Sequence, residues 1–411
     1  MLLQKRGDIV AKDTTWIKFR HKVVRNALYP ILGTYSRWRY HIKVEKFRGQ
    51  EKRPYLILLN HQTPFDQFFV GMSFRGPIYY LATEDLFSNG WVSSLIRYLI
   101  APIPIKKQTT DLRAVKTCMR VAKEGGTIAI APEGNRTYSG KTEYMNPSIA
   151  PLARKLGMPI ALYRIEGGYG AQPRWSDAIR RGPMRGYVSR VILPEEYADM
   201  TNDELYTAIK DGLYVNEAVC DSNYRHPKLA EYLERAIYVC PYCGLAEWES
   251  HRDRIQCKSC HREVQYLPSK ELKGVGFEFP YRFISEWYDA QADFINELDV
   301  TTLTEQPLYQ DTADWYEVIL YDRKVPLHKK VAVTLYGDRM ELQTPDQKLV
   351  FAFSETSAIT VLGRNKLNVY HGENIYQFKG GKRFNALKYV HLFNRHKNLV
   401  KGDAHVKFLG L

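Results

Sequence analysis

Two short polar motifs contain side chains suited to acid–base chemistry and to anion binding. In the first, Asp66 follows His61 by five positions and could accept the Nδ1 proton of the imidazole, which leaves Nε2 free as a base. The second motif is Pro-Glu-Gly-Asn-Arg at residues 132–136. Gly134 lets the backbone approach an anion closely, and Arg136 offers a planar set of donors to a phosphate. Together these residues predict a base that deprotonates a substrate hydroxyl beside a phosphate group.

Each of these residues also has a structural interpretation. A histidine and an aspartate at this spacing occur often by chance, so the pair alone does not identify an active site. Glu133 could be a loop carboxylate that pairs with Arg136 and never contacts substrate. Cys118 is a rival nucleophile, but its mid-helix position beside apolar residues favours a buried, unreactive thiol. The order and the context of the two motifs are what favour catalysis.

Both motifs directly follow short apolar runs, at residues 55–59 and 127–131, which we predict to be strands. Ligand sites gather at the carboxyl ends of strands in α/β sheets, so the two motifs should meet at one edge. Strand-like and helical patterns alternate over residues 54–225, which predicts an α/β layered domain with a mixed sheet flanked by helices. The further strands are predicted at residues 78–82, 159–165 and 187–193, and the helices at 111–124, 147–156 and 201–215.

In this order, the two motifs resemble those of the glycerolipid acyltransferase family, which includes the 1-acylglycerol-3-phosphate acyltransferases. The resemblance covers roughly residues 50–220. It implies that His61 is the catalytic base, that Asp66 orients it, and that Glu133 holds the acceptor loop. The implied phosphate contacts are Lys107, Gly134 and Arg136.

Two positions depart from the family pattern. Lys107 stands where the family usually has arginine, so a point charge would replace a bidentate donor and phosphate geometry would be looser. The run at residues 158–162 resembles the family's fourth block but lacks its usual second proline, which leaves the wall of the acyl pocket undefined.

The reaction that the resemblance implies is transfer of a fatty acyl group to the free hydroxyl of 1-acylglycerol 3-phosphate, which gives phosphatidate in phospholipid synthesis. Acyl-CoA and acyl carrier protein present the same thioester carbonyl, so both remain as donors. Another lysophospholipid is the alternative acceptor. No organic cofactor is expected beyond the thioester donor.

Four cysteines form two close pairs separated by thirteen residues. This spacing is typical of a zinc ribbon, here over residues 236–268, in which four thiolates fill the tetrahedral shell of a structural zinc. The four are Cys240, Cys243, Cys257 and Cys260, with His251 and His261 nearby as spare ligands. Disulfides are the poorer explanation, because no secretory signal is evident and a cytosolic chain is expected.

The net charge of +14 is concentrated at one end of the chain. Residues 1–53 hold 14 Lys and Arg against 4 Asp and Glu, a net +10, which attracts either nucleic acid or an anionic lipid surface. Within this basic arm, the pattern over residues 15–28 predicts an amphipathic helix that Pro30 ends or kinks. Such a helix either lies in lipid headgroups or packs on the first domain. Its apolar positions are Trp16, Phe19, Val23, Val24 and Ala27.

No run of eighteen apolar residues is present, so a transmembrane helix is not expected. We therefore expect a cytoplasmic protein that is peripheral on the cytoplasmic face of a membrane and binds its anionic surface.

The last part of the chain is predicted to be rich in β-structure. Beyond a connector at residues 269–328, short alternating strands over 330–378 precede a helix at 384–393, an order that resembles a small pleckstrin-homology-like barrel at 329–411.

A nucleic-acid-binding protein, gripping phosphates with the basic arm and the ribbon, is the alternative from a different functional class. It is disfavoured because it leaves the two polar motifs unexplained. A non-catalytic lipid-binding scaffold would have no need for an intact set of His61, Asp66, Glu133 and Arg136.

Overall fold

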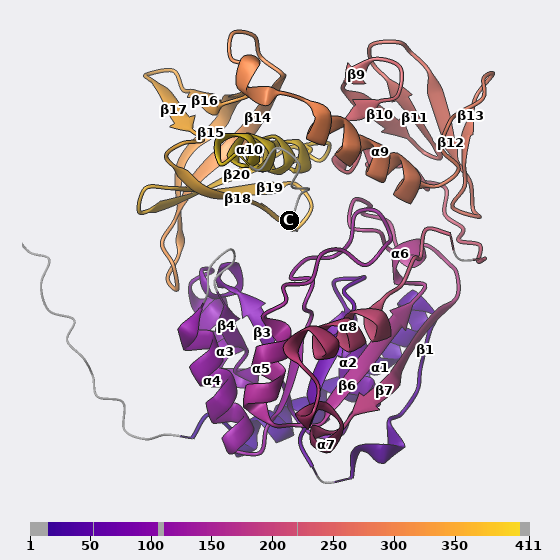
Figure 1. The fold of residues 1–411 in the computed structure, drawn as a ribbon, viewed down its shortest axis with the longest axis vertical. Helices are drawn as coiled ribbons and strands as arrows, with labels where there is room; N and C mark the ends of the chain where they lie inside the picture. Colours follow the sequence, from indigo (N-terminus) through magenta and orange to yellow (C-terminus); the bar gives the residue numbers. More distant parts are fainter. Residues whose placement is uncertain (1–14, 52, 106–110, 220, 403–411) are drawn as a thin grey trace, which may run out of the picture.

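The computed structural model describes residues 15–51, 53–105, 111–219 and 221–402. Figure 1 shows an α/β domain in the lower half and a β-rich upper half. One seven-stranded sheet, in the order β1-β7-β6-β2-β5-β3-β4, forms the centre of the α/β domain. It is mixed, as predicted, because β7 runs antiparallel to β6 whereas β2 runs parallel to β5 and β6. The strands are β1 (Ile42–Val44), β2 (Leu56–Leu59), β3 (Ile78–Thr83), β4 (Ile103–Ile105), β5 (Thr127–Ile130), β6 (Ile160–Glu166) and β7 (Met184–Ile192).

Helices cover both faces of this sheet, and strand β2 shows how its sequence allows that. Leu56 and Leu58 belong to the core beneath α4, α5 and α8, whereas Ile57 and Leu59 belong to the core beneath α1 and α2. Side chains alternate along a strand, so a strand buried on both faces is a continuous apolar run. The helices are α1 (Phe19–Tyr40), α2 (Asp66–Ser73), α3 (Trp91–Ile100), α4 (Leu112–Lys123), α5 (Ile149–Leu156), α6 (Gly168–Ala171), α7 (Pro194–Ala198) and α8 (Asn202–Leu213).

Helix α1 is longer than the sequence predicts. Pro30 lies inside it and does not end it. Proline removes one backbone N–H from the helix, and here the later turns are held by packing of the buried Gly33 and Ser36. The helix ends only at Tyr40, and the capping residue His41 has a left-handed φ of 53°.

The four cysteines lie in the next region, the cysteine-rich sheet. A hairpin of β8 and β9 precedes a four-stranded antiparallel sheet in the order β10-β11-β12-β13, and helix α9 follows. Strand β13 extends the sheet beyond residue 268. The elements are β8 (Val239–Cys240), β9 (Gly244–Leu245), β10 (Trp248–His251), β11 (Arg254–Cys257), β12 (Glu263–Tyr266), β13 (Leu272–Gly274) and α9 (Ile284–Glu297).

The C-terminal region is an antiparallel β half-barrel covered by helix α10 (Leu387–Val400). It begins at Tyr309, within the stretch that the sequence analysis predicted to be a connector. The prediction missed this first strand because the partly exposed Asp314 and Glu317 interrupt its apolar pattern. Its seven strands lie in the order β17-β16-β15-β14-β20-β19-β18. They are β14 (Tyr309–Val318), β15 (Lys324–Leu335), β16 (Arg339–Gln343), β17 (Lys348–Ala352), β18 (Thr356–Leu362), β19 (Lys366–His371) and β20 (Asn374–Gly380).

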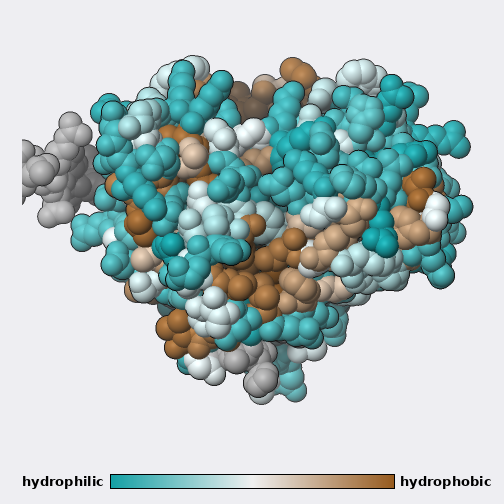
Figure 2. Space-filling view, turned by 90° about the horizontal axis from the view of Figure 1, so that it is seen from above, coloured by the Kyte–Doolittle hydropathy of each residue, from teal (hydrophilic) through white to brown (hydrophobic). Residues whose placement is uncertain are grey.

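The cysteine-rich sheet, α9 and the half-barrel share one hydrophobic core, so they pack as a single unit. Seen from above, the molecule presents a mainly hydrophilic face with a hydrophobic patch near its centre (Figure 2).

Candidate active site and metal centre

His61 and Asp66 are brought together at the carboxyl end of β2. His61 lies in the loop after the strand, and Asp66 is the first residue of α2. The His61 Nδ1 lies 2.8 Å from the Asp66 Oδ2. An ionised carboxylate only accepts hydrogen bonds, so beside it Nδ1 carries the proton and Nε2 presents a lone pair. The His61 side chain is 27% exposed and Asp66 only 1%, so the imidazole reaches the surface and the carboxylate lies behind it.

The Asp66 carboxylate is fixed by three further donors. Its Oδ2 accepts from the Gln62 backbone N–H at 2.7 Å. Its Oδ1 accepts from the Thr63 N–H at 2.9 Å and from the Thr63 hydroxyl at 2.7 Å. The carboxylate therefore has a single orientation, and that orientation aims one oxygen at His61.

Glu133 braces the same loop from the second motif. One of its oxygens accepts from the His61 backbone N–H and the other from the Glu143 N–H, each at 2.9 Å. Burial raises the pKa of Glu133 to about 8, although the two N–H donors oppose that shift. The carboxyl group thus ties the His61 loop to the segment after β5, which is compatible with the loop-holding role predicted for it.

Gly134 and Arg136 lie at the carboxyl end of β5, the neighbour of β2 in the sheet. Gly134 has a φ of +68°, a conformation that side chains disfavour. The Arg136 Nη1 is buried and has no hydrogen-bond partner among the described residues. Burial, then the nearby Arg174 and Arg364, lower the pKa of Arg136 to about 10, so it remains a cation at neutral pH. A buried donor without a partner is a natural position for an anionic ligand.

Sequence reasoning assigned no role to two residues that position the site. The Asn60 side chain exchanges hydrogen bonds with the backbone N–H and carbonyl of Ile165, at 2.7 and 2.9 Å, and so pins the His61 loop to β6. Arg174 donates to the Arg136 carbonyl at 3.0 Å. Asn60 directly precedes His61 and could have been singled out, whereas nothing in the local sequence marks Arg174.

Two other predicted residues have simple outcomes. Lys107 lies outside the described residues. Cys118 is fully buried, and burial raises the pKa of its thiol to about 12, in keeping with an unreactive core cysteine.

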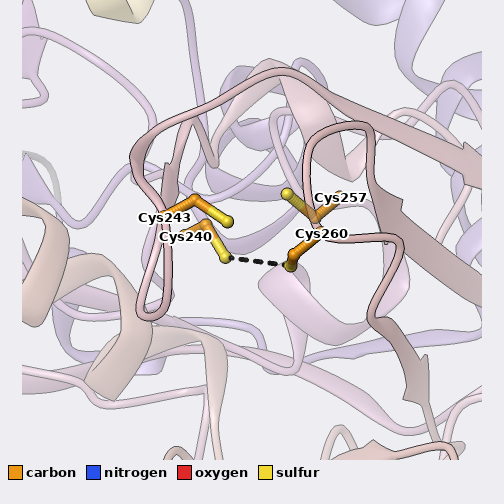
Figure 3. Close-up of side chains that lie close together, drawn as sticks. All are labelled: Cys240, Cys243, Cys257 and Cys260. Atoms are coloured by element: carbon orange, nitrogen blue, oxygen red, sulfur yellow. Dashed lines mark hydrogen bonds between the residues drawn. The ribbon is translucent and has the colours of Figure 1, made fainter.

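The four predicted metal ligands converge from two turns of the cysteine-rich sheet (Figure 3). Their sulfur atoms all lie within 4.8 Å of one another. Cys240 and Cys257 are buried, Cys260 is partly buried and Cys243 is exposed. The cluster can therefore hold a metal ion.

All four cysteines of this cluster are free thiols, and the spacing of two of their sulfur atoms suits metal coordination. The Cys240 and Cys260 sulfur atoms are 3.9 Å apart, well beyond the roughly 2.05 Å of a disulfide. Tetrahedral coordination with metal–sulfur bonds of about 2.3 Å separates the sulfur atoms by about 3.8 Å. The residues present thus fit a four-thiolate site.

Comparison with known proteins agrees with the geometry of the first site. Residues 41–164 match the family model described as Acyltransferase. A chloroplastic 1-acyl-sn-glycerol-3-phosphate acyltransferase of Brassica napus is 22% identical over 48% of this chain and 56% of its own length. The 1-acyl-sn-glycerol-3-phosphate acyltransferase of Bacillus subtilis is 21% identical over 33% of this chain and 65% of its own.

Among solved structures, the 1-acyl-sn-glycerophosphate acyltransferase of Thermotoga maritima aligns with a TM-score of 0.40 and 21% identity, over 47% of this chain and 78% of that chain. The chain spans less than two thirds of the length of the curated relatives it matches. The family model covers both polar motifs, His61 to Asp66 and residues 132–136. The chain therefore contains an acyltransferase domain.

Proposed function

We propose that this domain transfers a fatty acyl group from a thioester to the free hydroxyl of 1-acylglycerol 3-phosphate, giving phosphatidate. The observation that carries the proposal is the His61–Asp66 pair at the sheet edge that also holds Arg136, whose buried Nη1 has no hydrogen-bond partner among the described residues. Relatives named as 1-acyl-sn-glycerol-3-phosphate acyltransferases support the choice of acceptor.

The chemistry needs no covalent enzyme intermediate. The acceptor hydroxyl oxygen attacks the thioester carbonyl carbon while His61 Nε2 takes the hydroxyl proton. The carbon–sulfur bond then breaks, and the leaving thiolate recovers that proton from the imidazolium. Asp66 stabilises the imidazolium as it forms. Arg136, with Lys107 implied by the family resemblance, would bind the phosphate. Acyl-CoA and acyl carrier protein both remain as donors.

An assay of the purified protein tests this function directly. Acyl-CoA and acyl carrier protein donors are each paired with lysophosphatidate, with other lysophospholipids and with monoacylglycerol. We expect phosphatidate from lysophosphatidate with at least one donor, and none from the His61→Ala variant. No acylation of any lysolipid by the folded wild-type protein would refute the proposal.

We also propose that the domain docks on the cytoplasmic face of a membrane through an apolar surface of α1 and α3, called here the apolar face. On α1, exposed apolar side chains recur every three or four residues as a stripe, and the 80% exposed Phe19 begins it. A second stripe on α3 begins with the 76% exposed Trp91. Arg20 joins the helices by donating to the Tyr98 carbonyl at 2.8 Å. The apolar face comprises Phe19, Val23, Ala27, Ile31, Tyr35, Trp38, Trp91, Leu95 and Tyr98.

The apolar face suits interfacial binding better than membrane spanning. None of the helices within the described ranges combines the length and apolar character needed to cross a membrane. Exposed Lys22 and Arg37 on α1 add positive charge that anionic headgroups would attract. The stripe of exposed apolar residues supports the interfacial interpretation of the basic arm, while buried residues such as His21 show that the opposite side of α1 is packed.

For the cysteine cluster we propose one structural zinc ion. Four thiolates complete a tetrahedral shell and leave no position for water or substrate. We further propose that the half-barrel with α10 is pleckstrin-homology-like, which the antiparallel strands followed by a C-terminal helix support.

A further inference from the structure

The half-barrel lies against the sheet edge that carries the active site. Its β14–β15 turn contacts the segment after β3, where the Gly90 N–H donates to the Asp322 carbonyl at 2.9 Å and the Tyr321 N–H donates to the Ser88 hydroxyl at 3.3 Å. Lys324 also forms an ion pair with Asp85. Because β3 pairs in parallel with β5, the segment after β3 lies at the same edge as residues 132–136 (Figure 1).

Arg174 connects a second turn of the half-barrel to the motif at residues 132–136. Its Nη1 donates to the Arg136 carbonyl at 3.0 Å. Its Nε donates to the carbonyl of Gly363 in the β18–β19 turn at 3.3 Å, and its Nη2 donates to the carbonyl of Val361 near the end of β18 at 3.4 Å. The buried guanidinium of Arg174 thus bridges the backbone of the motif at residues 132–136 and the turn that carries Arg364.

Positive charge exceeds negative charge at this junction. The Arg174 residue is only 3% exposed, and among the described residues its guanidinium donates to three neutral backbone carbonyls. Arg364 pairs through Nη1 with Asp177 at 3.1 Å, but Asp177 is also held by Arg235 at 2.7 Å. One carboxylate therefore serves two arginines, while the Arg136 Nη1 has no described partner.

We propose that Arg364 is a specificity residue of the acyltransferase site, contributed by the half-barrel, which binds the anionic phosphate of the acceptor together with Arg136. This inference rests on the proposed function. The half-barrel thereby completes the acceptor site that the α/β domain begins, and an anion bound there relieves the repulsion among the three arginines.

Arg364 suits this role better than Arg174 does. Each nitrogen of the Arg174 guanidinium already donates to a backbone carbonyl, so Arg174 is a positioning residue. Arg364 is 30% exposed and has one ion pair among the described residues, which leaves other N–H groups of its guanidinium for a ligand. A phosphate oxygen can be shared between such donors, as arginine pairs commonly do.

The test compares Arg364→Gln, which removes the charge, with Arg364→Lys, which keeps it. Lys348→Gln is the matched control, because it removes one positive charge from the opposite edge strand β17 of the same half-barrel. KM and kcat are measured with lysophosphatidate and with monoacylglycerol, at low and high salt. In parallel, calorimetry measures binding of glycerol 3-phosphate, a headgroup probe that requires no turnover.

We expect Arg364→Gln to raise KM for lysophosphatidate about tenfold or more with little change in kcat, as for loss of a charge-assisted contact. Its constants for monoacylglycerol should not change, Arg364→Lys should recover most of the loss, and Lys348→Gln should match the wild type. Glycerol 3-phosphate binding should weaken in parallel.

The outcomes separate this inference from the proposed function. Equal losses on both acceptors, or an unchanged KM for lysophosphatidate, would show that Arg364 is only structural and would overturn the inference alone. If the wild type acylates no lysolipid, the proposed function fails, and the calorimetry still decides. Weaker glycerol 3-phosphate binding in Arg364→Gln would then support the anion site, and unchanged or absent binding would overturn it.

Discussion

Replacing Asp66 with asparagine alters one atom of the site and tests how His61 is held. The carboxylate accepts four hydrogen bonds, two on each oxygen, from His61, Gln62 and Thr63. An amide has only one acceptor oxygen, so its NH₂ group must face two of these donors. The variant keeps the size of the side chain, which leaves the packing of α2 intact.

Either orientation of the amide impairs the base. With NH₂ toward His61, Nδ1 must accept, the proton moves to Nε2, and no lone pair faces the substrate. With the oxygen toward His61, NH₂ faces Thr63, whose hydroxyl can rotate to accept, but the imidazolium loses its carboxylate. The first orientation leaves the backbone N–H of Gln62 without an acceptor, and the second leaves that of Thr63. Either buried, unpaired N–H lowers the folding stability by about 1–3 kcal/mol.

The expected result is a turnover rate lower by about 10²- to 10⁴-fold, the usual worth of a positioned general base, with the protein still folded at 25 °C. Rates of phosphatidate formation and thermal melts would be measured for Asp66→Asn, His61→Ala and the double variant. Asp203→Asn, at an exposed position in the first turn of α8, serves as the control. If Asp66 acts through His61, adding Asp66→Asn to His61→Ala should change little. A near wild-type rate in Asp66→Asn would refute the reasoning. So would a double variant that is much slower than His61→Ala alone.

Three further predictions follow from the other sites. Arg136→Ala should raise KM for lysophosphatidate about tenfold or more, and an equal loss on monoacylglycerol would contradict a phosphate contact. Phe19→Ser with Trp91→Ser should weaken binding to anionic vesicles in a flotation assay, whereas Val350→Ser, an exposed apolar residue of β17, should not. Metal analysis should find one zinc per chain and a loss of zinc in Cys257→Ser, and zinc-free wild type purified without chelator would exclude the site.

Much of the α/β domain could be predicted from the sequence, because the signals for it are local. Strand β2 is buried on both faces, so it is a continuous apolar run that ends directly before His61. The helix predicted from residue 201 also has a local signal, because Thr201 and Glu204 exchange hydrogen bonds at the start of α8. The cysteine pairs belong to this class too, since each lies in one short turn.

Features that depend on distant partners could not be predicted. The length of α1 beyond Pro30 is set by packing against α2, which no helical pattern records. Strand β14 carries partly exposed polar residues that hide its alternation. Arg174 reaches Arg136 from the segment after α6, and Arg364 comes near it only because the half-barrel docks on the α/β domain.

The shared core links the metal centre to the acceptor site more closely than to the base. Tyr138 and Trp175, beside Arg136 and Arg174 in the sequence, are buried in the core that includes Cys240 and Cys257. His61 is held instead by Asp66, which belongs to the α/β domain. Loosening of the cysteine-rich sheet should therefore displace the arginines first and leave the base in place. In the proposed mechanism His61 supplies the chemistry and the arginines supply phosphate affinity, so loss of metal should raise KM for the acceptor more than it lowers kcat.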